Sequence, residues 1–209
     1  SSPRLPRGAV RIGGYGGAAG LADYLRAESV TAVVDATHPF AERITANAAA
    51  ACRIAGLPLL RLSRPGWGAH PGAGTWHWVT DFAAAKLRAE QLGERLFLTT
   101  GRGTLPHFAG WTDRYVLVRL VEPPATPLPE GWELLLDRGP FSLEQERSLL
   151  RDHQVGVLVT KDSGGATAAK LDAAAAESVP VVIVARPADP TGVPVVHSVA
   201  EAQHWLLAR

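Results

Sequence analysis

The chain passes from strand to helix in the stretch AVVDATHPF, residues 32–40. The first three residues are small and apolar and predict a buried strand of a parallel sheet. Pro39 is suited to the first position of a helix, where its missing N–H costs no hydrogen bond. The polar residues between them therefore follow the carboxyl end of a strand, which is where α/β sheets bind ligands. This stretch predicts a strand–turn–helix unit with a site in its turn.

The same order of elements recurs along the chain. Strands are expected at residues 10–12, 32–34, 59–62, 96–98, 115–121, 157–159 and 181–184. Helices are expected at residues 40–55, 81–92, 142–152 and 166–177 and after Ser198, where Ser142 and Ser198 each begin a capping box. Two of the strand–helix–strand runs end in the same pair, Arg64-Pro65 and Arg186-Pro187. Strands that alternate with helices in this way predict an α/β fold with mainly parallel sheets.

Composition narrows the class of protein. The 209 residues suffice for one large or two small domains, and 46% hydrophobic residues exclude general disorder. A net charge of +1 gives no support for nucleic-acid or membrane-surface binding, and no apolar run is long enough to span a bilayer. One cysteine excludes a disulfide framework and suits a reducing compartment, so we expect a cytoplasmic protein.

A glycine cluster supplies the first candidate site. Residues 14–19, GYGGAA, fit the G-x-G-x-x-A pattern between an expected strand and a helix, and Asp35 ends the next strand. Glycines there let the backbone approach a pyrophosphate, which the helix N-terminus attracts. A plain tight turn is the alternative.

The turn at residues 35–40 is the second candidate. His38 titrates near neutrality and could donate a hydrogen bond or a proton, and Thr37 could face a ligand. The alternative is that Thr37 only caps the helix and His38 makes an ordinary polar contact.

Three further turns follow expected strands or lie between elements. They contain Arg102, the pair Arg138-Gly139, and the glycine-flanked Lys161, all of which could hold an anion. A surface arginine and a solvated loop are the alternatives. The chain has neither a Walker A sequence nor the H-E-x-x-H or G-x-S-x-G motifs, and we expect no metal site.

Together these turns resemble the precorrin-6A reductase family of cobalamin (corrin) biosynthesis. The matching strings run in order across nearly the whole chain: RIGGYGG (11–17), DATHPFA (35–41), TGR (100–102), RGPF (138–141) and KDSGG (161–165). DATHPFA is the most specific of them. The resemblance implies two Rossmann-like lobes with NADPH and the macrocycle in a cleft between them. The implied reaction is hydride transfer from NADPH to a conjugated carbon of precorrin-6A, which gives dihydro-precorrin-6A.

The resemblance also implies roles for individual residues. We expect an NADPH-binding lobe at residues 1–112 and a substrate-binding lobe at 113–209. The cofactor would contact Gly13, Gly14, Tyr15, Gly16, Gly17, Asp35, Ala36, Thr37, His38, Pro39 and Gly101. The tetrapyrrole would contact Phe40, Arg102, Arg138, Gly139, Lys161, Asp162, Ser163, Gly164 and Gly165. Thr37 and His38 are the candidate catalytic residues, and the product is expected to pass to neighbouring pathway enzymes.

Two departures from the family pattern affect these expectations. The chain has no methionine, and the family opens with a strand, a GGT turn, a helix and a second strand that this chain lacks. We therefore expect about 30–40 residues to be missing, so that the match at residues 14–19 follows the third strand and not the first. Asp162 stands where many relatives are expected to have Asn.

Three other functions remain open at this point. The chain could reduce the cobalt-containing form of the substrate, or it could be a two-lobe binding protein without catalysis. A dihydrodipicolinate-type reductase also has a T-H-P sequence at a strand end, but its second-lobe turns do not match.

Overall fold

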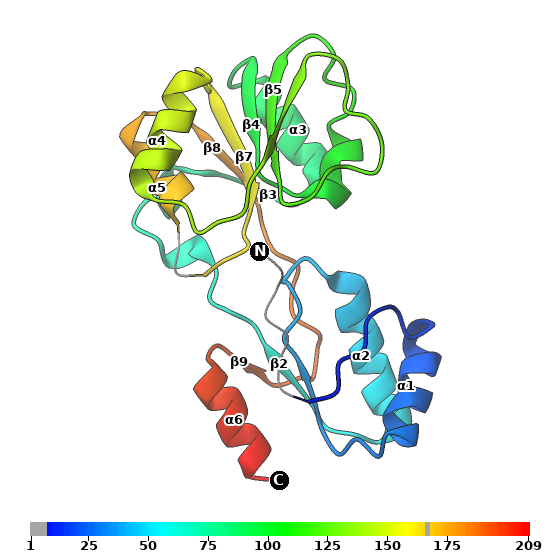
Figure 1. The fold of residues 1–209 in the computed structure, drawn as a ribbon. Coiled ribbons are helices and arrows are strands. Elements are labelled where there is room, and N and C mark those ends of the chain that lie inside the picture. The colour runs from blue at the N-terminus through cyan, green and yellow to red at the C-terminus, as the bar shows by residue number, and fades with distance from the viewer. Residues whose placement is uncertain (1–7, 166–167) are drawn as a thin grey trace. The chain divides into compact units, whose positions relative to one another are not determined.

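The computed structural model describes residues 8–165 and 168–209, and every strand pair in that part of the chain is parallel. The chain divides into two compact units (Figure 1). Unit 1 comprises Ser1–Arg64 together with Ala188–Arg209, and unit 2 comprises Pro65–Pro187. The expected α/β fold with parallel sheets is thus confirmed. No described helix is both long and apolar enough to cross a membrane.

Unit 1 contains a three-stranded sheet in the order β1-β2-β9. Its strands are β1 (Val33–Asp35), β2 (Leu59–Leu62) and β9 (Val195–Val196). Helix α2 (Glu42–Ala55) connects β1 to β2 and packs against α1 (Gly17–Ala27), and α6 (Val199–Leu207) follows β9. The core between α1, α2 and the sheet contains small side chains, such as Ala22, Ala51 and Cys52, which let the two helices approach closely.

Unit 2 contains a six-stranded sheet in the order β3-β8-β7-β4-β5-β6. The strands are β3 (His77–Val79), β4 (Arg95–Leu98), β5 (Tyr115–Leu120), β6 (Trp132–Leu136), β7 (Val157–Lys161) and β8 (Val181–Val184). The helices are α3 (Phe82–Glu90), α4 (Leu143–Asp152), α5 (Ala169–Ala176) and the short η1 (Trp67–Ala69), η2 (Ala73–Thr75) and η3 (Arg102–His107). Fully buried apolar residues fill β4, β5, β7 and β8, as expected for a sheet covered on both faces.

The order of these strands creates a switch point between β4 and β7. From β4 the chain continues through η3, which packs against α3, to β5 on one side. From β7 it continues through α5, which packs against α4, to β8 on the other side. Right-handed crossovers in opposite directions place α3 and α5 on opposite faces of the sheet. The carboxyl ends of adjacent strands diverge there, and such a crevice is the usual ligand position in this class of fold.

The local predictions are largely confirmed. Gly56 ends α2 with a left-handed φ of 70°, Asp81 caps α3, and the capping boxes at Ser142 and Ser198 are both present. The strand predicted at residues 10–12 is wrong: this segment is exposed and irregular because no described strand pairs with it. Strands β3, β6 and β9 are not among the expected strands.

The expected domain boundary after residue 112 does not separate the two units. Strands β4 and β5 lie on either side of that position in the sequence and pair directly within one sheet. The chain instead passes between the units at Arg64-Pro65 and again at Pro187-Ala188. The two Arg-Pro pairs that the sequence repeats are therefore the two crossing points.

A close contact at Gly20 yields the first prediction. A β-carbon at this position in α1 would lie 1.9 Å from the carbonyl oxygen of Tyr15, so the glycine cluster can approach the helix only if residue 20 is Gly. We expect Gly20→Ala to lower the free energy of unfolding by about 1–3 kcal/mol, measured by denaturant titration. Gly68→Ala is the control, because a β-carbon there meets no atom within 4 Å. Equal stability of the two variants would contradict this account.

Candidate functional site

A cavity of about 440 Å³ lies at the carboxyl edge of the unit 1 sheet, and we call it the unit 1 pocket. It is formed by residues at or just after the carboxyl ends of β1, β2 and β9. They are Ala36, Thr37, His38, Pro39, Leu62, Arg64, His197 and Val199. Four of the predicted cofactor-contacting residues, 36–39, therefore line one cavity at the expected edge.

Asp35 is not among the residues that line this pocket; its side chain organises the turn beside it, and its contact with a cofactor stays a prediction. Its side chain is 3% exposed, and its Oδ2 lies 2.8 Å from Nη1 of Arg61, which is 2% exposed. Its Oδ1 accepts hydrogen bonds from the backbone N–H and the hydroxyl of Thr37 at 3.0 and 2.7 Å. Arg61 Nη1 also donates to Thr37 Oγ1 at 3.1 Å, and Arg61 Nε pairs with Asp189 at 3.3 Å. This network holds the backbone of residues 35–37 in one conformation.

The network also sets the ionisation of Asp35. Burial alone would raise its pKa, but the hydrogen bonds from Thr37 and Thr45 and the charge of Arg61 together lower the pKa below its ordinary value. The carboxylate is therefore charged at neutral pH and keeps Arg61 compensated. Because the Thr37 hydroxyl proton is donated to Asp35, Thr37 is better suited to position its neighbours than to release a proton.

Two histidines of the unit 1 pocket have opposite hydrogen-bonding roles. His38 Nδ1 accepts a hydrogen bond from the backbone N–H of Phe40 at 3.1 Å, so a neutral His38 carries its proton on Nε2. His197 Nδ1 lies 2.7 Å from the carbonyl oxygen of Ser63 and must donate to it, which leaves Nε2 as an acceptor when the ring is neutral. The sequence analysis did not identify His197, because it follows a strand of only two residues.

The glycine cluster lies at the N-terminus of α1. Gly16 is the N-cap residue with φ of 78°, and Gly17 follows with φ of 88°, so both adopt conformations that other residues rarely reach. A β-carbon at Gly13, Gly14, Gly16 or Gly17 would meet no described atom within 4 Å. Tyr15 packs on Tyr24, and the guanidinium of Arg11 lies 4.8 Å from the Tyr15 ring centroid. The backbone here is open to a ligand, and contact with a cofactor stays a prediction.

A second cavity, the unit 2 pocket, has a volume of about 460 Å³ and lies at the carboxyl edge of β4, β5 and β6. It includes three predicted residues: Gly101, Arg102 and Gly139. It also includes Arg119 and Lys170, which the sequence analysis missed. Gly101, predicted to contact the cofactor, thus belongs to unit 2, whereas the other predicted cofactor residues belong to unit 1.

Lys161 ends β7 at the switch point. Its Nζ lies 3.5 Å from the place that a β-carbon of Gly101 would occupy, so the ammonium group and the turn after β4 are close neighbours. Burial lowers the pKa of Lys161 below its ordinary value. The position agrees with the predicted role of an anion contact.

The residues after Lys161 bind other parts of unit 2. Asp162, which is 5% exposed, accepts hydrogen bonds from Arg186 Nε at 2.8 Å and from the backbone N–H of Trp67 at 2.9 Å. A β-carbon at Gly164 would lie 2.2 Å from the carbonyl oxygen of Pro65, and the carbonyl of Gly165 accepts from Trp67 Nε1. We call this set of contacts the crossing clamp, because it holds both segments through which the chain enters and leaves unit 2. Substrate contact by residues 162–165 stays a prediction.

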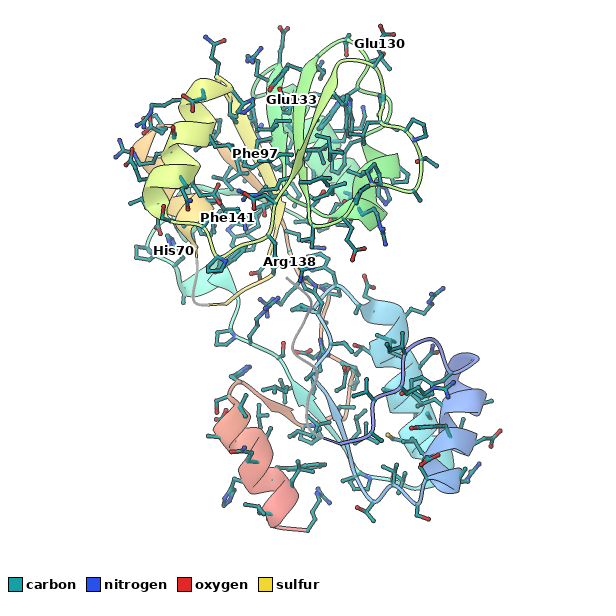
Figure 2. The ribbon with its side chains drawn as sticks, in the orientation of Figure 1. His70, Phe97, Glu130, Glu133, Arg138 and Phe141 are labelled. Atoms are coloured by element: carbon teal, nitrogen blue, oxygen red, sulfur yellow. The ribbon has the colours of Figure 1, made fainter. Side chains whose placement is uncertain are left out.

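Like Lys161 and residues 162–165, two further predicted substrate residues lie outside both pockets. Arg138 is exposed in the loop between β6 and α4 (Figure 2), and its backbone N–H donates to Asp137. Phe40 lies beside the ring of His38, at a centroid distance of 5.9 Å, and does not line the unit 1 pocket. These positions leave both roles as predictions.

Comparison with known proteins decides the family. The model of the family described as precorrin-6x reductase CbiJ/CobK matches residues 1–207. The chain belongs to the precorrin-6x reductase family. This match confirms the resemblance drawn from the five sequence strings. Members of this family are enzymes.

Individual members of the precorrin-6x reductase family are similar over almost the whole chain. A precorrin-6A reductase of Rhodococcus erythropolis is 49% identical over 98% of this chain and 82% of its own length. One of Mycobacterium tuberculosis is 50% identical over 98% of this chain and 83% of its own length. A cobalt-precorrin-6A reductase of Priestia megaterium is 31% identical over 80% of this chain and 69% of its own length.

A solved structure of CobK precorrin-6A reductase has the same fold. It is 39% identical to this chain, with a TM-score of 0.88, and the match covers 100% of this chain and 83% of that one. Parallel sheets and the element order are thus those of a known reductase.

The buried Asp35–Arg61 pair yields a prediction on stability. We expect Asp35→Asn to lower the free energy of unfolding by about 3 kcal/mol, because it leaves Arg61 buried without its main counter-charge. The control is Asp113→Asn, which removes a 74% exposed carboxylate paired with Arg114 and should change stability by less than about 0.5 kcal/mol. Similar losses in the two variants, measured by denaturant titration, would argue against this role.

The same pair predicts a dependence on pH. A lowered pKa in the folded state means that Asp35 stabilises the protein fully above its unfolded pKa of about 3.9 and loses this contribution as the pH falls further. The difference in unfolding free energy between the wild type and Asp35→Asn should therefore be constant from pH 5 to 7 and shrink below about pH 4. A difference that grows on acidification would be inconsistent with the direction of the shift.

Proposed function

We propose that this chain catalyses the reduction of precorrin-6A to dihydro-precorrin-6A in cobalamin biosynthesis, with NADPH as the reductant. The observation that carries the proposal is 49–50% identity over 98% of the chain with two precorrin-6A reductases. The two pockets at carboxyl edges of parallel sheets support it, because that edge is where this class of fold binds cofactors and substrates.

The residues of unit 1 fit a nicotinamide cofactor. Backbone N–H groups at the N-terminus of α1 and the open space beside the glycines suit a phosphate group. The rings of His38 and His197 both line the unit 1 pocket, and imidazoles are hydrogen-bonding groups that suit a carboxamide with its carbonyl oxygen and amino group. NADPH, when bound, supplies the hydride for the reaction.

The remaining residues act by orientation and charge. The Asp35–Arg61–Thr37 network keeps the turn that carries His38 in place. Arg102 and Lys161, which lie at the carboxyl edge of unit 2, suit the carboxylate side chains of the macrocycle. We assign the proton to no single acid, because the pyrrolic system carries exchangeable protons of its own.

Similarity favours the metal-free substrate over the cobalt-containing one. The two precorrin-6A reductases are 49% and 50% identical to this chain, whereas the cobalt-precorrin-6A reductase is 31% identical over a smaller part of it. We place the reaction in the cytoplasm, which agrees with the single, buried and unpaired Cys52. Transfer of the product to neighbouring enzymes of the pathway remains part of the proposal.

The proposed function predicts substrate-dependent oxidation of NADPH. We expect the absorbance at 340 nm to fall when precorrin-6A is added to the protein and NADPH under anaerobic conditions, with a smaller rate for the cobalt-containing substrate. NADH in place of NADPH tests the choice of cofactor. No oxidation with either substrate would contradict the proposal, and a faster rate with the cobalt form would assign the chain to the other reductase.

The role of His38 predicts the effect of its removal. We expect His38→Ala to raise the KM for NADPH and to lower kcat by less than about 100-fold, since the residue orients the cofactor and is not the essential acid. His204→Ala is the control, because this exposed histidine of α6 lines neither pocket. A loss in kcat above 100-fold with normal substrate binding would instead make His38 the proton donor.

A further inference from the structure

Arg119 is a largely buried cation that uses little of its hydrogen-bonding capacity within the described part of the chain. It lies near the carboxyl end of β5, and its side chain is 9% exposed. Its guanidinium lies 3.9 Å from the ring centroid of Phe141 and 5.0 Å from that of Phe97, so aromatic rings cover it. Within residues 8–165 and 168–209, only one of its five N–H groups donates to a protein acceptor. None of the other Arg119 nitrogens is both fully buried and without a partner among the described residues, so these donors face the cavities that Arg119 lines, where a ligand can supply acceptors.

That one acceptor is Glu146 of α4. Arg119 Nη2 donates to Glu146 Oε1 at 2.8 Å, and the carboxylate is 2% exposed. The second oxygen, Oε2, has no hydrogen-bond partner in the described part of the chain. Both residues line a small cavity of about 190 Å³ together with Phe141 and Lys170. The ion pair therefore holds the guanidinium at the wall of this cavity and leaves the cavity open.

The surroundings define the charge of the ligand. Arg119 and Lys170 line both the small cavity and the unit 2 pocket, which also receives Arg102. The carboxylates of Glu122 and Asp137 line the unit 2 pocket as well. This mixture of charges suits a singly charged carboxylate, whereas a doubly charged phosphate would be repelled by the nearby acidic groups.

The carboxyl edge of unit 2 is also where a ligand is expected. Figure 2 shows Phe141 and Arg138 at one end of the unit 2 sheet and Glu130 and Glu133 at the other, the amino end of β6. Strand β5 runs parallel to β6, and Arg119 is its penultimate residue, so Arg119 lies near the same end of the sheet as Arg138 and Phe141. Arg119 thus lies near the carboxyl edge of the sheet, where this class of fold binds ligands, and not at the amino edge.

We propose that Arg119, oriented by Glu146 and assisted by Lys170, binds an acidic side chain of the tetrapyrrole in the unit 2 pocket. This inference rests on the proposed function for the identity of the ligand. Arg119 is then a specificity-determining residue that touches the substrate, and Glu146 is a positioning residue that acts through it. The bond from Nη2 to Glu146 leaves one edge of the planar guanidinium, which can bind a carboxylate through two parallel hydrogen bonds.

The test removes both members of the pair at once. Arg119→Met alone would leave Glu146 buried and uncompensated, so the double variant Arg119→Met/Glu146→Met is used, which replaces the pair with apolar side chains of similar size. We expect its KM for precorrin-6A to rise at least tenfold, with kcat within threefold and the KM for NADPH unchanged. Arg114→Met is the matched control, since it removes a cation just before β5, at the opposite edge of the sheet, and should leave all three constants unchanged.

A second variant and a binding measurement make the test independent of folding and of activity. Arg119→Lys keeps the charge beside Glu146 but cannot form two parallel hydrogen bonds, and it should raise the KM for precorrin-6A several-fold. Binding of uroporphyrin III, a stable tetrapyrrole with eight carboxylates, is followed by fluorescence and should weaken at least tenfold in the double variant.

The possible outcomes separate the two proposals. Unchanged KM and unchanged uroporphyrin III binding in the folded variants would overturn the assignment of Arg119, as would an increase confined to the KM for NADPH. If the wild-type protein does not reduce precorrin-6A, the proposed function fails, while the uroporphyrin III measurement still decides whether Arg119 binds a tetrapyrrole carboxylate.

Discussion

One buried carboxylate, that of Asp162, holds together the two segments through which the chain enters and leaves unit 2. It accepts hydrogen bonds from the side chain of Arg186, next to the exit, and from the backbone of Trp67, next to the entrance. The contact leaves so little room that a β-carbon at Gly66 would lie 2.6 Å from Asp162 Oδ2. Because Asp162 directly follows Lys161, the same contact fixes the turn at the end of β7. The position of Lys161, a candidate anion contact of unit 2, therefore depends on hydrogen bonds of Asp162 that also hold the two crossing segments together.

Unit 1 repeats this arrangement. Asp35 ends β1 and pairs with Arg61 on the next parallel strand, β2, as Asp162 after β7 pairs with Arg186 after β8. In both units an acidic residue at a strand end binds an arginine of the neighbouring strand, across one strand–helix–strand run. Such buried ion pairs contribute little net stability, but they restrict the backbone beside them to one conformation. Rigid turns at the carboxyl edge are what a site for a cofactor and a macrocycle requires.

The sequence allowed the α/β class, most helices and most buried strands to be predicted, because these depend on local signals. Glycine at 56 and the capping boxes at Ser142 and Ser198 act within one turn of chain, and apolar runs mark strands covered on both faces. Strand β6 escaped prediction because Trp132–Leu136 contains a glutamate and no β-branched residue and lies at an exposed sheet edge. The apolar residues Val10 and Ile12 led to a wrong strand prediction for the opposite reason: a strand needs a partner strand, and a short apolar pattern does not reveal whether one exists.

The candidate site was predictable only in its turns. Residues 36–39 and 101–102 stood out because polar or glycine residues follow apolar strands. Arg119 lies inside a strand and His197 after a two-residue strand, so neither position carries a local signal. The boundary after residue 112 was wrong because β4 and β5, on either side of it, pair in one sheet. Likewise, β9 near the C-terminus pairs with β2 in the first third of the chain. No local sequence signal indicates which distant strands pair.

The crossing clamp also bears on the order in which the chain folds. The sheet of unit 1 cannot be completed until β9 returns to β2, and all of unit 2 lies between these strands in the sequence. Closing so long a loop in an unfolded chain is entropically costly. Once unit 2 has folded and Asp162 holds its entrance next to its exit, that loop is effectively short. From this topology we expect unit 2 to fold before the sheet of unit 1 is completed.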